Sequence, residues 1–119
     1  MKGIETYQEN TVTTQSKGGL VVMLYEGAIK FLKLAIKDIE AGNPEAKGEY
    51  IVKAQNIINE LNVTLNTEAG GEIAASLRRL YMFMDQLLTA ANIKQDTDKI
   101  EEVIKLLEEL NQGWKAISD

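Results

Sequence analysis

The sequence predicts an all-α protein, an antiparallel up-and-down four-helix bundle with an N-terminal arm. The composition favours helix, with a single proline and many leucine, isoleucine, alanine, glutamate and lysine residues. Apolar residues recur at helical spacing in four segments of about 20 residues each. The breaks between these segments are short, so consecutive helices must run antiparallel. We therefore assign residues 1–19 to an arm and loop and residues 20–119 to the bundle domain.

The first predicted helix, residues 20–40, organises the rest of the chain. Ser16 is the predicted N-cap after a polar loop, and Gly42 suits the left-handed C-terminal cap. Charged residues occupy only about 80° of its circumference and apolar residues about 240°, whereas a surface helix needs little more than 100°. We expect this helix to pack on two sides and also to keep some apolar surface for a partner. The predicted core stripe is Leu20, Met23, Leu24, Phe31, Leu34 and Ala35.

An edge of that helix is the first candidate binding surface. Val22, Tyr25, Ile29 and Ile36 lie between the predicted core stripe and the charged strip. They either line a groove for a partner helix or pack inside the bundle beneath neighbouring helices, and the pattern alone leaves both readings open.

The second predicted helix begins at Asn43-Pro44, with asparagine as N-cap and proline at the first helical position. Its outer face lacks charge, which is unusual. This face is either merely solvated or bonds to the backbone of another chain, because neutral amides are less costly to dehydrate than charges. Its predicted core residues are Tyr50, Ile51, Ala54, Ile57, Ile58, Leu61 and Leu65, and its uncharged outer face holds Val52, Gln55, Asn59, Asn62, Val63 and Asn66.

Gly70-Gly71 separates this helix from a third, predicted from Glu72 to about Asn92. Met82 and Phe83 fall outside its core stripe. A fourth helix is predicted from a cap at Asp96 or Thr97 to about Ile117. The core stripes are Ile73, Leu77, Leu80, Tyr81, Met84, Leu87, Leu88 and Ala91 in the third helix, and Ile100, Val103, Ile104, Leu107, Leu110 and Trp114 in the fourth.

Composition and charge exclude many kinds of function. The 119 residues include no histidine and no cysteine, so disulfides, thiolate metal sites and histidine-dependent triads cannot form. A net charge of −5 argues against nucleic acid or an anionic membrane as the main partner. The polar N-terminus does not resemble a signal peptide, and no apolar run is long enough to span a membrane. We predict a soluble, cytoplasmic protein that is not an enzyme, with no catalytic, cofactor or metal residues.

Several motifs resemble those of one family. They are Tyr7 and Asn10 in the arm, MLYEGAI at 23–29, IINEL at 57–61, GGEIA at 70–74, Ala91-Asn92, and Trp114. These residues are similar to FliS, the family of cytoplasmic export chaperones for bacterial flagellin. The resemblance implies a helical bundle that binds the C-terminal segment of flagellin, prevents premature polymerisation and assists delivery to the flagellar type III export gate. It also implies that the N-terminal arm can cover part of the binding surface.

Two hypotheses therefore stand. The first is an export chaperone, a monomer or weak homodimer when free, whose partner helices dock in apolar grooves. The second is a structural bundle that uses the surplus apolar stripe of its first long helix as a homodimer interface. The candidate partner-binding residues are Tyr7, Val22, Tyr25, Ile29, Ile36, Val52, Asn59, Val63, Met82 and Phe83.

Overall fold

The computed structural model describes residues 17–68 and 71–117, and within these ranges every long element is an α-helix. The helices are α2 (Lys17–Glu40), α3 (Pro44–Glu68), α4 (Gly71–Lys94) and α5 (Thr97–Ile117). The predicted all-α bundle is confirmed, and the ends of α3, α4 and α5 agree with the predicted ends to within about a turn.

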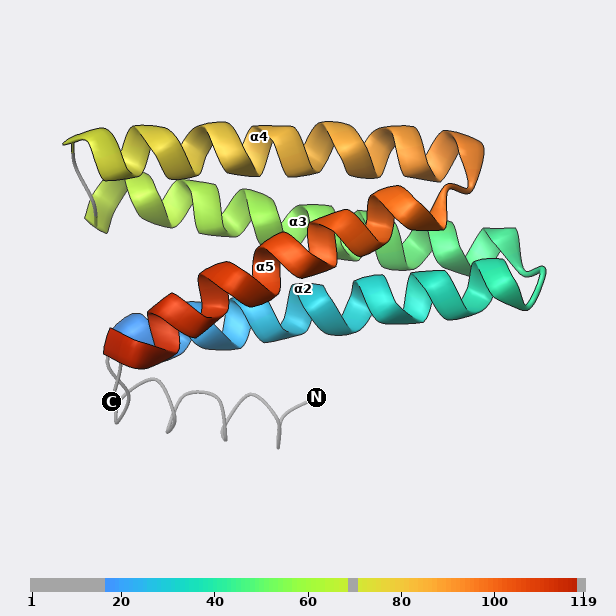
Figure 1. The fold of residues 1–119 in the computed structure, drawn as a ribbon, viewed down its shortest axis with the longest axis horizontal. Coiled ribbons are helices and arrows are strands. Elements are labelled where there is room, and N and C mark those ends of the chain that lie inside the picture. Colours follow the sequence, from blue (N-terminus) through green and yellow to red (C-terminus); the bar gives the residue numbers. More distant parts are fainter. Residues whose placement is uncertain (1–16, 69–70, 118–119) are drawn as a thin grey trace, which may run out of the picture.

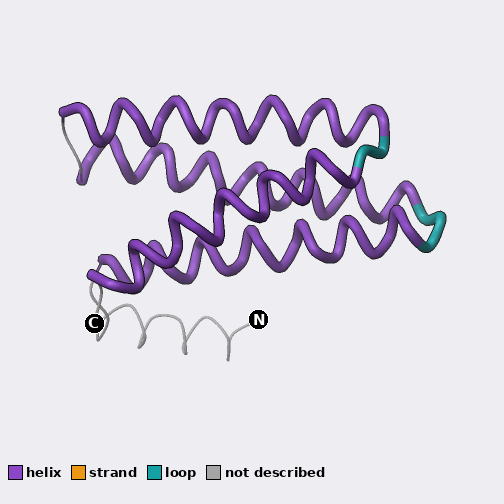
Figure 2. The backbone as a smooth tube through the Cα atoms, in the orientation of Figure 1, coloured by secondary structure: helices purple, strands orange, loops and turns teal. Residues whose placement is uncertain are grey.

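The helices form an up-and-down bundle in which each lies beside its neighbours in sequence (Figure 1). Helix α2 packs against α3 and α5, and α4 packs against the same two helices on the other side. The described loops, α2–α3 and α4–α5, lie at the same end of the bundle (Figure 2). Helix α2 is therefore packed on two sides, as its wide apolar surface predicts.

Capping interactions explain where the helices end. The Gly42 and Asn43 amides donate to the carbonyls of Ile39 and Asp38 at 3.0 and 2.8 Å, the double closure of a Schellman motif. Gly42 has the left-handed φ of 75° that this motif requires. At the start of α5, Oδ1 of Asp96 accepts from the amide of Asp98 at 3.0 Å, so Asp96 is the N-cap.

Helix α2 begins earlier than predicted. Lys17, Gly18 and Gly19 form its first turn, although the two glycines predicted a loop. Glycine disfavours a helix by only about 1 kcal/mol per residue, which the long apolar segment that follows can outweigh. The predicted cap at Ser16 lies outside the described residues.

The core runs along the bundle axis between all four helices. All of the predicted core residues of α5 are buried or half-buried, as are those of α3. On α4 the prediction is wrong at Ile73, which is 72% exposed, while Ala74 is buried in its place. Ile73 lies in the first turn of α4, at one end of the bundle.

The face that α2 turns inward also differs from the prediction. In the predicted core stripe, Leu20 and Met23 are partly exposed, whereas Ala35 is buried as predicted. Tyr25, which was placed at the edge of that stripe, is also fully buried. A helix with apolar residues over most of its circumference does not specify which side is innermost, because several rotations bury similar apolar area. The positions of α3 and α5 decide the rotation.

Candidate functional site

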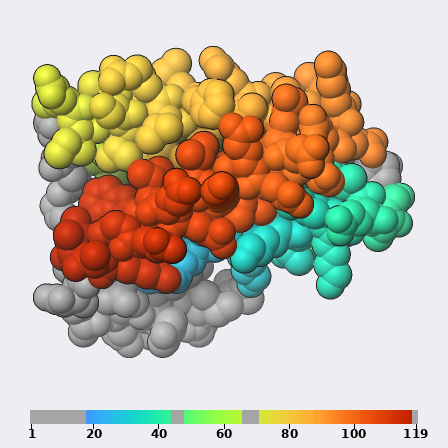
Figure 3. All heavy atoms as spheres, in the orientation of Figure 1, coloured from blue at the N-terminus to red at the C-terminus, as the bar shows by residue number. Residues whose placement is uncertain are grey.

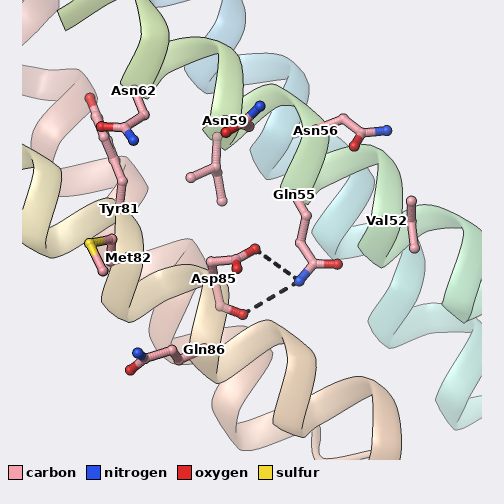
Figure 4. A pocket seen from close by; sticks show the side chains of 10 residues that line it. Val52, Gln55, Asn56, Asn59, Asn62, Tyr81, Met82, Asp85 and Gln86 are labelled. Atoms are coloured by element: carbon pink, nitrogen blue, oxygen red, sulfur yellow. Dashed lines mark hydrogen bonds between the residues drawn. The ribbon is translucent and has the colours of Figure 1, made fainter. Parts of the chain in front are cut away.

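A groove lies between α3 and α4 (Figure 4). It has a volume of about 410 Å³. Buried Ile58 and Tyr81 lie at its base, and amide side chains from both helices line its walls. We call it the amide groove, defined by Val52, Gln55, Asn56, Ile58, Asn59, Asn62, Tyr81, Met82, Asp85 and Gln86.

One side chain of the amide groove connects its two walls. Gln55 Nε2 on α3 lies 3.0 Å from Asp85 Oδ1 and 3.4 Å from the Asp85 carbonyl oxygen on α4, as Figure 4 shows. The same nitrogen lies 3.0 Å from Thr89 Oγ1. These contacts hold the helices together at one end of the groove and engage its only carboxylate.

The remainder of the groove offers exposed apolar side chains and one unpaired polar atom. Val52 is 47% exposed and Met82 56% exposed, one on each helix. Oδ1 of Asn62 is buried without a hydrogen-bond partner among the described residues. A buried acceptor without a donor is unfavourable, so a donor supplied by a docked chain would be stabilising there.

The structure brings three of the candidate binding residues together and separates the others. Val52, Asn59 and Met82 line the amide groove. Val63 and Phe83 are exposed but do not line it. Val22 and Ile36 are half-buried on α2, and Tyr7 lies outside the described residues.

Two candidates are buried in the bundle itself. Tyr25 is inaccessible to solvent and Ile29 nearly so. Of the two readings left open for this edge of α2, interior packing therefore holds for these two residues, and the groove reading does not. Neither can make an extensive contact with a partner while the bundle keeps this packing. Their burial follows from the rotation of α2 described above, and for Tyr25 also from a hydrogen bond that satisfies its hydroxyl.

That hydrogen bond belongs to an aromatic cluster beneath the amide groove. The hydroxyls of Tyr25 and Tyr81 are 2.5 Å apart, and the Trp114 indole also hydrogen-bonds to Tyr25. Both tyrosine pKa values are raised, mainly because burial disfavours the charged phenolate. The two hydroxyls are thus neutral partners that hold α2 against α4 and α5.

On the α4 side of the amide groove, sequence reasoning identified Met82 but missed Asp85 and Gln86. The sequence pattern predicted the uncharged face of α3. It could not predict which residues lie opposite that face, because this depends on which helix packs beside α3. Sequence reasoning also did not identify a second groove between α2 and α5, whose only signal is the lysine series at 30, 33 and 37.

The described residues contain no group of three or more acidic side chains placed to hold a metal ion. No described helix is both long enough and apolar enough to cross a membrane. What the site does offer is an apolar base, exposed apolar rims and hydrogen-bonding amides. Fold and site together define a helical bundle protein with a surface groove of the kind into which helices of other proteins dock.

Comparisons with known proteins specify this class further. The family model described as "Flagellar protein FliS" matches residues 1–119, and the chain belongs to the FliS family. A flagellar secretion chaperone FliS from Bacillus subtilis (strain 168) is 44% identical over 109 residues, which are 92% of this chain and 80% of that protein. A flagellar secretion chaperone FliS from Salmonella typhimurium (strain LT2) is 42% identical over 121 residues, covering 98% of this chain and 90% of the relative.

The fold is also that of a solved structure. A crystal structure of a flagellar chaperone from bacteria matches with a TM-score of 0.79 and 19% identity, over 98% of this chain and 94% of the other. The family-model match and the two curated relatives confirm the sequence resemblance to FliS. Membership of this family makes the chain a flagellar secretion chaperone and not an enzyme.

Proposed function

We propose that this chaperone binds the C-terminal segment of flagellin in the cytosol, prevents its premature polymerisation and assists its delivery to the flagellar type III export apparatus. The observation that carries the proposal is the amide groove, whose rims expose Val52 and Met82. An amphipathic helix of the flagellin tail docks there with its apolar face on these two side chains.

The chemistry of the amide groove suits such a ligand. Methionine adapts its shape to different apolar surfaces, so Met82 can follow the contour of a docked helix. Neutral amides such as Asn59 and Asn62 bond to donors or acceptors of the tail without the desolvation penalty of a charge. Since a disordered tail loses conformational entropy when it binds, the remaining contacts must extend beyond this groove.

An affinity measurement with matched variants tests the proposal. We expect Met82→Asp to weaken binding of a synthetic flagellin C-terminal peptide at least tenfold in calorimetry, about 1.4 kcal/mol. The control is Ile93→Asp on the same helix, because Ile93 is 76% exposed and lies outside the groove. Equal affinities for the two variants, with both folded by circular dichroism, would contradict the proposed site.

The homodimer alternative has less surface available than the sequence suggested. Tyr25 and Ile29, which were half of its proposed apolar stripe, are buried within one chain. Leu20 and Met23 remain partly exposed on the same helix. Sedimentation equilibrium of the free protein decides between the two: the chaperone proposal expects a monomer or a weak dimer, and the structural bundle expects a tight one.

A further inference from the structure

The groove between α2 and α5 has a different chemistry from the amide groove. We call it the lysine groove, with a volume of about 720 Å³. Ile29 and Leu34 contribute its apolar surface. Lys30, Lys33 and Lys37 follow one side of α2, and Lys115 lies opposite on α5. In Figure 3, α5 runs diagonally across this face, with the surface of α2 emerging beside it.

The charge of the lysine groove is opposite to that of the chain. Its four lysines outnumber Glu26 and Glu108, which leaves a local charge of +2 on a chain with a net charge of −5. Glu26 pairs with Lys115 at 3.1 Å and Glu108 pairs with Lys33 at 3.5 Å. Lys30 and Lys37 have no carboxylate partner among the described residues.

These ion pairs do not prevent docking. The four paired side chains are each about half exposed, and exposed ion pairs contribute little to stability. Carboxylates from a docking chain can therefore replace those of Glu26 and Glu108 without a large loss of free energy. They can also pair with Lys30 and Lys37.

A buried polar group gives an independent sign that the lysine groove receives a ligand. Asn111 lines it and is only 4% exposed, yet its Oδ1 has no hydrogen-bond partner among the described residues. A native structure rarely leaves a buried acceptor without a donor. A docking chain that carries one amide or hydroxyl donor in its apolar stripe would satisfy it.

We propose that the lysine groove binds an acidic amphipathic helix of a second protein, independently of flagellin binding in the amide groove. The apolar stripe of that helix covers half-buried Leu34 and only the small exposed part of Ile29. Its acidic residues flank the stripe and pair with the lysines. A helix of this kind fits the groove because the lysine series spans two turns of α2, from Lys30 to Lys37. A nucleic acid fits less well, since two net positive charges would bind a polyanion weakly on an acidic chain.

Three synthetic peptides test the proposal with the full chain. All three are helical designs of about 18 residues, with one leucine stripe interrupted by a central asparagine. They differ only in the flanking residues, which are glutamate, glutamine or lysine. We expect the glutamate peptide to bind at least about tenfold more tightly than the glutamine peptide, and the lysine peptide more weakly still. We also expect the preference to weaken as salt is added.

Two sets of variants locate the binding. The double substitution Lys30→Glu and Lys37→Glu should remove the preference for the glutamate peptide. The control, Lys53→Glu with Lys94→Glu, makes the same change of net charge outside the groove and should keep it. Asn111→Leu should weaken binding of the glutamate peptide while leaving the bundle folded, because the substitution removes the acceptor for the peptide's central asparagine.

The outcomes separate this proposal from the proposed function. Met82→Asp should not change the affinity for the glutamate peptide. Lys30→Glu with Lys37→Glu should not change the affinity for the flagellin peptide. The proposal is overturned if the three peptides bind equally, if both double variants weaken binding alike, or if a single-stranded oligonucleotide displaces the glutamate peptide. None of these results bears on flagellin binding in the amide groove.

Discussion

The hydroxyl pair of Tyr25 and Tyr81 allows a quantitative test of the packing of α2. Tyr25 is fully buried and Tyr81 is only 2% exposed, so a hydroxyl that loses its partner is left in a largely desolvated position. Tyr25→Phe isolates the Tyr81 hydroxyl and should destabilise the protein by about 1–3 kcal/mol. Tyr81→Phe should cost less, about 0.5–1.5 kcal/mol, because the Tyr25 hydroxyl keeps its bond to Trp114.

The double variant distinguishes pairing from simple burial. With both hydroxyls removed, neither is left unpaired, so the double substitution should cost less than the sum of the single ones by about 0.5–1.5 kcal/mol. Urea unfolding followed by circular dichroism measures all three free energies of unfolding. Strictly additive costs would refute the pairing. If the folded Tyr25→Phe variant instead lost much of its affinity for the flagellin peptide, Tyr25 would have to be part of the binding surface.

Three other predictions concern stability. Leu107→Ala should lower the free energy of unfolding by about 2–5 kcal/mol in urea titrations, since Leu107 is fully buried; a barely changed midpoint would mean that α5 is not packed as described. Gly42→Ala should destabilise the protein by about 1 kcal/mol and Gln95→Gly should stabilise it by a similar amount, because both positions have a left-handed φ, 75° and 54°. If the two substitutions shift the melting temperature in the same direction, this account of the helix ends is refuted. The free energy of unfolding should fall as pH rises past about 10, because tyrosines ionise there in the unfolded chain while the raised pKa values of Tyr25 and Tyr81 keep both side chains neutral in the folded protein. The double variant, Tyr25→Phe with Tyr81→Phe, should lose less stability over the same pH range.

Local chemistry made much of the fold predictable. Gly42, Asn43-Pro44 and Asp96 each have a side chain or backbone preference that suits one position at a helix end, and each is found there. The stripe of α5 was predictable because one face is apolar and the other charged, so only one rotation buries the apolar side chains.

Properties that depend on neighbouring helices were less predictable. Helix α2 is apolar over so much of its circumference that the pattern could not place Tyr25 inside and Met23 outside. The uncharged face of α3 was recognised from the sequence, but Asp85 opposes it only because α4 packs there. Nothing in the sequence indicated that Asn111 belongs to the lysine groove, because only the packing of the helices shows that its Oδ1 is buried without a donor.

The most direct test of the central claim is where the flagellin tail contacts the chaperone. Methyl-labelled methionine is well placed to report it by NMR, since Met82 lies in the amide groove, Met23 is partly exposed on α2 and Met84 is buried. On saturation with the flagellin C-terminal peptide, we expect the Met82 methyl resonance to shift strongly while that of Met23 stays in place. A tail that binds and shifts Met23 but leaves Met82 unchanged would contradict the assignment of the amide groove as the flagellin site.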